Sequence, residues 1–232
     1  MRPVKLAGVV ILCATALLFV YMWFRRSHSP HSPQQITLMS PSSILFSLPT
    51  ISDIGPLTAR MTKPSPDAIR MHEDDWRQIE FVAVEALPMV ERELAELEAF
   101  KRINWTGAGW KNVYVRKSRP DALRPKGISY ADLLASIPHG PVRDLMIGTT
   151  GHEAWVKDGF VFPISGMELL YGDHREGMIV TLALARRSAQ GVQPIPLDVV
   201  ALCNKFRLIV VDWEACRVIA GRQPTSTNGP GK

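Results

Sequence analysis

Two pairs of neighbouring residues are the strongest candidates for acid–base chemistry in this sequence: His152-Glu153 and Asp173-His174. Imidazole and carboxylate groups are common general acids and bases. A metalloprotease helix would need a second histidine four residues after His152, but that position holds Val156. We therefore assign no catalytic residue, and keep as an alternative a membrane-anchored enzyme of unrecognised type that uses this region.

A metal or cofactor site is not indicated elsewhere in the chain. The run 72–75 (HEDD) contains ligand-type side chains, but a carboxylate loop for a metal ion would need alternating oxygen donors and a turn glycine. Neither a nucleophile elbow nor a phosphate-binding glycine loop is present. We expect no metal and no cofactor, and we lean towards a protein that is not an enzyme.

A second role for Asp173 and His174 is binding. They lie in the sequence GDHREG, between the apolar runs 167–171 and 178–185. This arrangement predicts a hairpin whose longer loop displays both side chains, and exposed loop tips often carry binding residues. Ordinary charged turn residues are the simpler interpretation.

The most distinctive feature is a separation of charge. Residues 85–98 contain five acids and one arginine, whereas residues 101–126 contain eight basic residues and one acid, with aromatic residues between them. Three ligands are compatible: anionic lipid headgroups, an acidic protein partner, or single-stranded nucleic acid. Alternatively, an acidic helix packs beside the basic stretch and the charges offset each other. The surface residues that we expect to contact a partner are Trp105, Trp110, Arg116, Lys117 and Arg119.

Nucleic acid is the least favoured of these ligands. The net charge is +5, but four basic residues lie before residue 27 and leave 23 basic against 22 acidic residues in 27–232. A nucleic-acid-binding domain is usually strongly basic as a whole. We expect no nucleic-acid partner.

The cysteines leave two states open. Cys203 and Cys216 are 13 residues apart, and Cys13 lies in an apolar run. An oxidising compartment would allow a disulfide between Cys203 and Cys216. Two buried free thiols are equally compatible, because free cysteine is among the most buried residue types.

Residues 6–24 are predicted to form a transmembrane anchor. These 19 residues carry no charge and are followed by Arg25-Arg26. As a helix they would span about 28 Å, close to the bilayer hydrocarbon thickness. Cleavage as a signal peptide after Ala16 would leave an exposed apolar N-terminus, so we favour a retained anchor. Residues 1–5 form a short basic tail before it.

The anchor predicts an inner- or plasma-membrane protein. Positive charges flank it on both sides and favour, by a small margin, a C-terminal domain outside the cytoplasm, which in a bacterium is the periplasm. Residues 27–66 are rich in Ser and Pro and predict a stalk, although the apolar stretch 44–57 is expected to lie along the domain or to form an edge strand. Residues 221–232 predict a disordered tail.

Residues 67–220 are expected to form one α+β domain with a mainly antiparallel sheet. Strands are predicted around 77–84, 110–116, 145–147, 153–156, 160–162, 167–171, 178–185, 207–212 and 216–220. A long acidic amphipathic helix is predicted from Pro88 to Asn104, with apolar positions four and three residues apart. Shorter helices are expected after Ser129, a capping residue, and at 197–203.

Together these features indicate a single-pass membrane protein with a protein-binding domain. We expect an envelope accessory, adaptor or toxin-neutralising role, and a partner that is another envelope or secreted protein. The basis is the predicted anchor, the predicted stalk and a domain without a catalytic signature.

Overall fold

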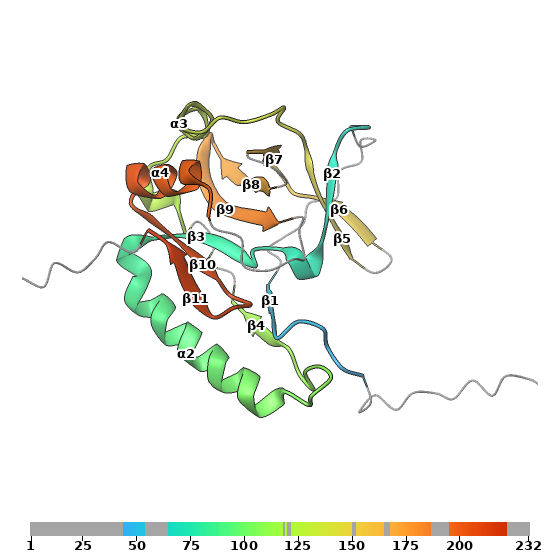
Figure 1. Cartoon of the computed structure of the whole chain (residues 1–232). Helices are drawn as coiled ribbons and strands as arrows, with labels where there is room; N and C mark the ends of the chain where they lie inside the picture. Colours follow the sequence, from blue (N-terminus) through green and yellow to red (C-terminus); the bar gives the residue numbers. More distant parts are fainter. Residues whose placement is uncertain are drawn as a thin grey trace, which may run out of the picture. The chain divides into compact units, whose positions relative to one another are not determined.

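The computed structural model describes residues 44–53, 65–117, 119, 122–149, 152–164, 168–186 and 195–221 (Figure 1). The predicted tail, anchor and first part of the stalk, at 1–43, lie outside the described residues, as does the C-terminal tail from 222. No helix in the described ranges is both long enough and apolar enough to cross a bilayer. The division into anchor, stalk and domain therefore stays a prediction, whereas the α+β class with a mainly antiparallel sheet is confirmed.

A six-stranded sheet forms the centre of the fold, and each of its strands is antiparallel to its neighbours. Its strands follow the order β11 (Arg217–Ala220), β10 (Leu208–Asp212), β3 (Ile79–Ala83), β9 (Met178–Arg186), β8 (Glu168–Arg175) and β7 (Gly159–Pro163).

Both faces of this sheet are apolar, because successive side chains of a strand point to opposite faces. In β3, Phe81 belongs to a cluster on one face and Val82 to a cluster on the other. In β8, Leu170 and Tyr171 divide in the same way. The sheet is therefore the middle layer of the domain and needs cover on both sides.

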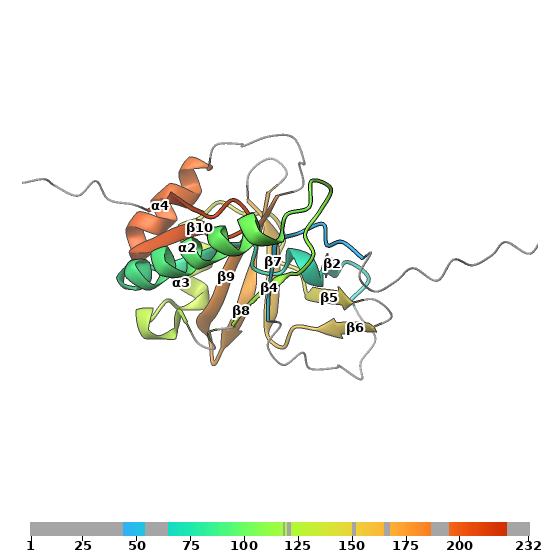
Figure 2. The same cartoon turned by 90° about the horizontal axis from the view of Figure 1, so that it is seen from below.

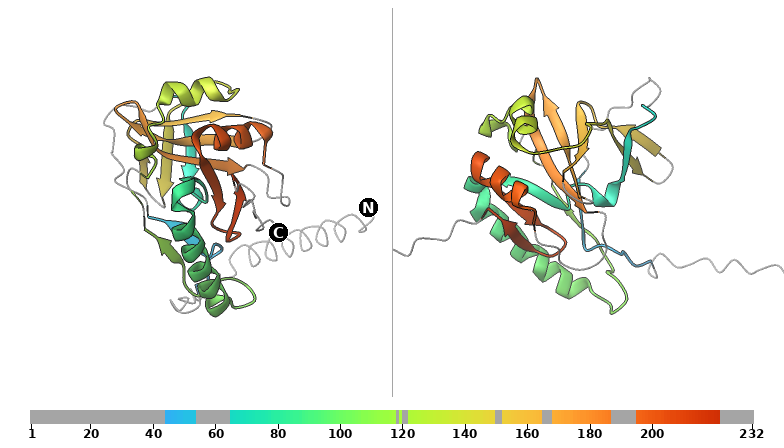
Figure 3. Two further views of the ribbon diagram at one scale, coloured as in Figure 1. Left: turned by 90° about the vertical axis from the view of Figure 1, so that its left-hand side faces the viewer. Right: turned by 45° about the horizontal axis from the view of Figure 1, so that its top comes forward.

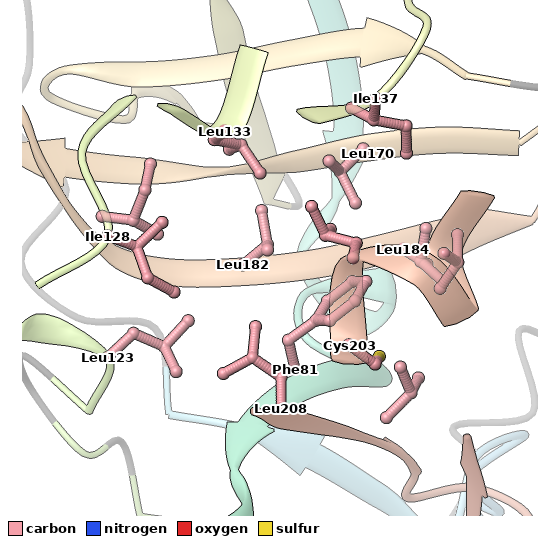
Figure 4. Close-up of a cluster of buried hydrophobic side chains, with 14 of the residues drawn as sticks. Phe81, Leu123, Ile128, Leu133, Ile137, Leu170, Leu182, Leu184, Cys203 and Leu208 are labelled. Carbon is pink, nitrogen blue, oxygen red and sulfur yellow. The ribbon is translucent and has the colours of Figure 1, made fainter. Parts of the chain in front are cut away.

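Helices α3 (Tyr130–Ser136) and α4 (Leu197–Phe206) cover the first face (Figure 4). The Ser129 hydroxyl accepts a hydrogen bond from the Asp132 backbone N–H at 3.0 Å, which confirms the predicted cap. The short 3₁₀ helix η4 (Arg124–Lys126) precedes α3, and its neighbours Leu123 and Ile128 complete this cluster.

Helix α2 (Leu87–Asn104) covers half of the second face, over β3, β10 and β11 (Figure 2). It begins after the 3₁₀ helix η3 (Val84–Ala86). Pro88 lies in its first turn, where a backbone N–H would have no acceptor within the helix. Val90, Leu94 and Leu97 are buried at the predicted four- and three-residue spacing. Figure 3 shows α2 and α4 on opposite sides of β10 and β11.

A second, three-stranded sheet covers the other half of that face. Its order is β2 (Ile69–His72), β5 (Leu145–Thr149) and β6 (His152–Trp155), and the 3₁₀ helix η2 (Glu73–Asp75) follows β2. Met71, Trp76, Leu145 and Ile147 pack against Tyr171 of β8.

A two-stranded parallel ribbon lies between these two covers: β1 (Thr50–Ser52) pairs with β4 (Tyr114–Arg116). The strand predicted over 110–116 is thus shorter than expected. Residues 50–52 of the apolar stretch 44–57 form β1, which agrees with the predicted edge strand.

The hairpin of β8 and β9 differs from the sequence-based expectation. Asp173 and His174 lie inside β8, paired with Thr181 and Ile179, and the turn consists of Glu176 and Gly177 alone. The prediction of a displayed loop at Asp173-His174 is wrong, because backbone pairing continues to the tight turn.

The ribbon predicts that the stable domain includes β1 and therefore begins before residue 67. A chain starting at Asp67 lacks β1 and loses the Thr50 carbonyl and hydroxyl, which accept hydrogen bonds from Gln78 and Arg116. We expect it to be less stable than a chain starting at Ile44 by about 3 kcal/mol or more, since buried polar groups lose their partners. Chemical denaturation of both chains measures this, and equal free energies of unfolding would contradict a structural role for β1.

Candidate functional site

A groove of about 420 Å³ runs between α2 and β4 and is lined by two of the predicted binding residues, Lys117 and Arg119. The helix contributes four side chains at spacings of three, one and three residues, which places them on one face. The other wall comes from β4 and the segment that follows it. The lining residues are Met89, Arg92, Glu93, Glu96, Tyr114, Val115, Lys117 and Arg119.

Opposite charges face each other across this groove. Arg119 forms an ion pair with Glu93, and the Tyr114 hydroxyl donates to Glu96 at 3.4 Å. Outside the groove, Lys126 pairs with Glu85 at 3.2 Å. The acidic helix region and the basic stretch therefore do offset each other in part, as the simpler interpretation of the charge separation expected. Within the described ranges, Arg92 and Lys117 have no ion-pair partner.

One edge of β4 is open towards the groove. The Tyr114 N–H donates to the Pro49 carbonyl and the Asp53 N–H donates to the Arg116 carbonyl, both at 2.9 Å. In a parallel pair, the residue between two such residues directs its N–H and C=O away from the partner strand. Val115 is that residue, and its side chain is 55% exposed. Within the part of the chain that the structure describes, its backbone groups have no strand partner, so another extended segment could pair with them.

Behind the groove lies a buried charge cluster centred on Glu80. The Arg77 guanidinium donates to Glu80 Oε1 and the Trp213 indole N–H donates to Oε2 at 3.1 Å. Arg116 Nη1 lies 3.9 Å from the same carboxylate, and its guanidinium stacks 4.8 Å from the Trp213 ring. A cavity of about 10 Å³ separates this cluster from Glu93.

Two hydrogen bonds also hold the Arg116 guanidinium. Its Nε donates to the Thr50 hydroxyl at 3.2 Å, and its Nη2 donates to the Arg77 carbonyl at 3.1 Å. Burial lowers the pKa of Arg116 to about 10, while the Glu80 carboxylate opposes this shift and Arg77 adds to it. The side chain thus remains charged at neutral pH, and the two guanidinium groups outnumber the one carboxylate.

Arg77 adopts a backbone conformation that holds this cluster in place. Its φ is +57°, in the left-handed region that is unfavourable for residues other than glycine. The Arg77 N–H donates to the Tyr171 hydroxyl at 2.7 Å, and that hydroxyl donates to the Asp75 carbonyl at 3.2 Å. A strained backbone conformation persists only where surrounding contacts hold it in place. The hydrogen bonds around the Tyr171 hydroxyl do this for Arg77.

The five residues expected to form one contact surface occupy three different places. Lys117 and Arg119 line the groove, and Trp105 and Trp110 lie in the loop after α2. Arg116 is only 3% exposed. The expectation that Arg116 is displayed at the surface is wrong, because β4 turns it inward to pair with Glu80.

The two acid–base pairs lie on strands of different sheets. His152 and Glu153 lie on β6 of the three-stranded sheet, whereas Asp173 and His174 lie on β8 of the central sheet. The His174 ring packs against Tyr130, with ring centroids 4.6 Å apart. No group of three or more potential metal ligands occurs in the parts of the chain that the structure describes.

Cys203 and Cys216 both carry free thiols. Cys203 belongs to the cluster under α4, and Cys216 packs against the cluster under α2, on the opposite face of the sheet. Burial raises the pKa of Cys203 to about 12 and also raises that of Cys216.

Sequence reasoning missed Glu80, Arg77 and the α2 wall of the groove. A signal for Glu80 was present: it is the one charged residue in a strand, IEFVA, whose other side chains are apolar on both faces. Such a strand is buried on both sides, so an acid within it requires a buried cation.

No family model matches this chain, and neither a curated protein nor a solved structure is significantly similar to it.

The difference in burial between Arg116 and its neighbour Lys117 can be tested by substituting glutamate at each position. We expect Arg116→Glu to lower the free energy of unfolding by more than about 3 kcal/mol, because it puts a second carboxylate beside buried Glu80. Lys117→Glu should change it by less than about 1 kcal/mol, since Lys117 is exposed. Denaturant unfolding of both variants gives the values, and similar losses in the two would contradict the buried placement of Arg116.

The thiol assignment predicts the outcome of alkylation without a reductant. In the unfolded chain, the peptides containing Cys203 and Cys216 should both be fully modified by iodoacetamide. In the native chain both should react slowly at neutral pH, because raised pKa values leave little reactive thiolate. Mass spectrometry of the digested protein reports both states, and a linked pair of these peptides would refute free thiols.

Proposed function

We propose that this chain is a single-pass membrane protein whose α+β domain binds an extended segment of another envelope or secreted protein without catalysing a reaction. The observation that carries the proposal is the groove along the open edge of β4. We place the domain outside the cytoplasm, held by residues 6–24 as an anchor in the inner or plasma membrane. An adaptor, an envelope accessory protein and a toxin-neutralising protein would all use such a surface.

Strand addition is the binding mode that this groove favours. An extended segment beside β4 would accept a hydrogen bond from the Val115 N–H and donate one to its carbonyl. Its side chains would alternate between solvent and the face of α2 that carries Met89 and Glu93. The backbone bonds would supply affinity, and the groove would supply specificity.

The charges of the groove favour a segment that carries acidic side chains. Glu93 is already paired with Arg119, and Glu96 accepts from Tyr114, whereas Lys117 is exposed. The buried cluster behind the groove adds a further positive charge through Arg116. Complementary charge of this kind raises association rates and selects among partners.

The backbone edge can be blocked without removing a side-chain contact of the fold. Val115→Pro removes an N–H that β1 does not use, and proline is tolerated at strand edges whose N–H faces solvent. We expect it to lower partner affinity at least about tenfold, since bridging backbone bonds and close approach are both lost. Val115→Ala, which keeps the N–H, is the matched control and should retain affinity within a few-fold.

The partner is found by placing a photoreactive amino acid at position 117 of the full chain in its native membrane. Mass spectrometry identifies the adduct, and titration with the purified partner then compares the two Val115 variants. Equal binding by Val115→Pro and Val115→Ala would overturn strand addition. A full chain that leaves the membrane pellet on carbonate washing would overturn the anchor.

A further inference from the structure

Five of the nine large apolar side chains that are exposed in the described ranges gather at one end of the domain. This apolar end consists of the first described residues and of the last turn of α2 with the loop that follows it. Ile103 is 79% exposed and Trp105 is 49% exposed. The set is Ile44, Leu45, Phe46, Ile103 and Trp105.

Hydrogen bonds and close packing hold these two segments together. Phe46 and Trp110 exchange backbone hydrogen bonds of 2.9 and 3.0 Å. The Trp105 and Trp110 rings lie 4.7 Å apart. A side chain at Gly109 would lie 2.9 Å from the Phe46 carbonyl, so only glycine allows this approach.

The loop after α2 is also fixed from within. The side-chain amide of Asn104 donates to the Phe100 carbonyl at 2.9 Å and its oxygen accepts from Asn112 at 2.7 Å. The Lys111 N–H donates to the Asn104 carbonyl at 2.9 Å. Apolar and aromatic groups are therefore held at the surface in a defined arrangement. Contiguous exposed apolar groups of this kind usually mark a site of interaction with a protein or a membrane.

Three basic residues lie at or next to the apolar end. Arg102 and Lys111 are exposed beside it, and Lys101 donates to the Glu214 carbonyl at 2.7 Å. The nearest acid on α2 is Glu98, about one turn further from the end. Indole and aliphatic side chains beside exposed Arg102 and Lys111 match the interfacial zone of a bilayer that contains anionic lipids.

The position of the apolar end in the chain also favours contact with a bilayer. Ile44 is separated from the last residue of the predicted anchor by residues 25–43. Those 19 residues reach at most about 65 Å when fully extended, so the apolar end is the part of the domain nearest to the membrane along the chain. A tether of this length raises the effective concentration of the bilayer at that end.

We propose that the apolar end docks on the bilayer in which the chain is anchored, with Ile103 and Trp105 in the interfacial zone. This inference rests on the membrane anchor of the proposed function. The docked end lies at the C-terminal end of α2, whereas the groove lies along residues 89–96. At 1.5 Å per residue, the groove begins roughly 10 Å from the docked end and remains accessible to a partner.

Photo-cross-linking in vesicles tests the docking directly. The full chain carries benzoylphenylalanine at position 103 or, as a control, at position 197, which is 84% exposed at the start of α4. Figure 1 shows that α4 lies away from the loop after α2. In vesicles of phosphatidylcholine and phosphatidylglycerol, position 103 should form lipid adducts at least about tenfold more than position 197, because bulky apolar groups partition strongly from water.

A charge reversal separates docking on anionic lipid from chance contact. Lys111→Glu should reduce the lipid adduct of position 103 several-fold, since each basic residue near an anionic surface contributes to attraction. The matched control Lys157→Glu reverses an exposed lysine in the turn between β6 and β7 and should leave the adduct unchanged. In vesicles of phosphatidylcholine alone, the difference between the two variants should disappear.

Three results would overturn the inference. Equal lipid adducts at positions 103 and 197 would mean that the domain moves without docking. Protein adducts at position 103 in native membranes, without lipid adducts, would identify the end as a protein interface. A full chain that is absent from the membrane pellet would overturn the anchor as well, which distinguishes failure of the proposed function from failure of docking alone.

Discussion

The arrangement of this domain depends on one buried carboxylate. Glu80 pairs across the central sheet with Val211 on one side and Ala183 on the other, and these neighbours belong to the two separate apolar clusters of that face. A carboxylate at this boundary needs compensation, because an isolated charge in an apolar interior is very unfavourable. Arg77 supplies it from the same strand region, and Arg116 supplies it from β4. The ribbon that covers the boundary, and with it the groove, is therefore positioned by this charge.

Such a cluster contributes more to a defined arrangement than to net stability. Desolvation of three charged groups offsets much of their mutual attraction, and the lowered pKa of Arg116 reflects that cost. The left-handed backbone of Arg77 adds strain. A hydrogen bond from Trp213 to Glu80 and one from Arg116 to Thr50 further restrain the geometry of the cluster. An apolar residue in place of Glu80 would fill the sheet but would leave Arg116 of β4 without its buried carboxylate.

Helix α2 relates the proposed binding groove to the proposed membrane contact. Its buried residues pack on the sheet, its first half forms a wall of the groove, and its last turn carries Ile103 beside the Trp105 loop. One helix thus packs on the sheet and would also take part in the proposed partner binding and the proposed membrane contact. Because the helix is continuous over 18 residues, the distance between groove and membrane would be set by its length.

Local patterns in the sequence were sufficient for the elements whose signals are local. The apolar spacing in α2, the Ser129 cap and the two-residue period of the central strands all correspond to elements of the structure, because helix and strand periodicity depend on neighbouring residues. Lys117 and Arg119 were identified as candidate binding residues and do line the groove. The pairing of Glu80 with Arg116, the parallel ribbon and the α2 wall opposite Lys117 were decided only by the tertiary structure. Those contacts join segments tens of residues apart, and no short-range pattern encodes which strand lies beside which.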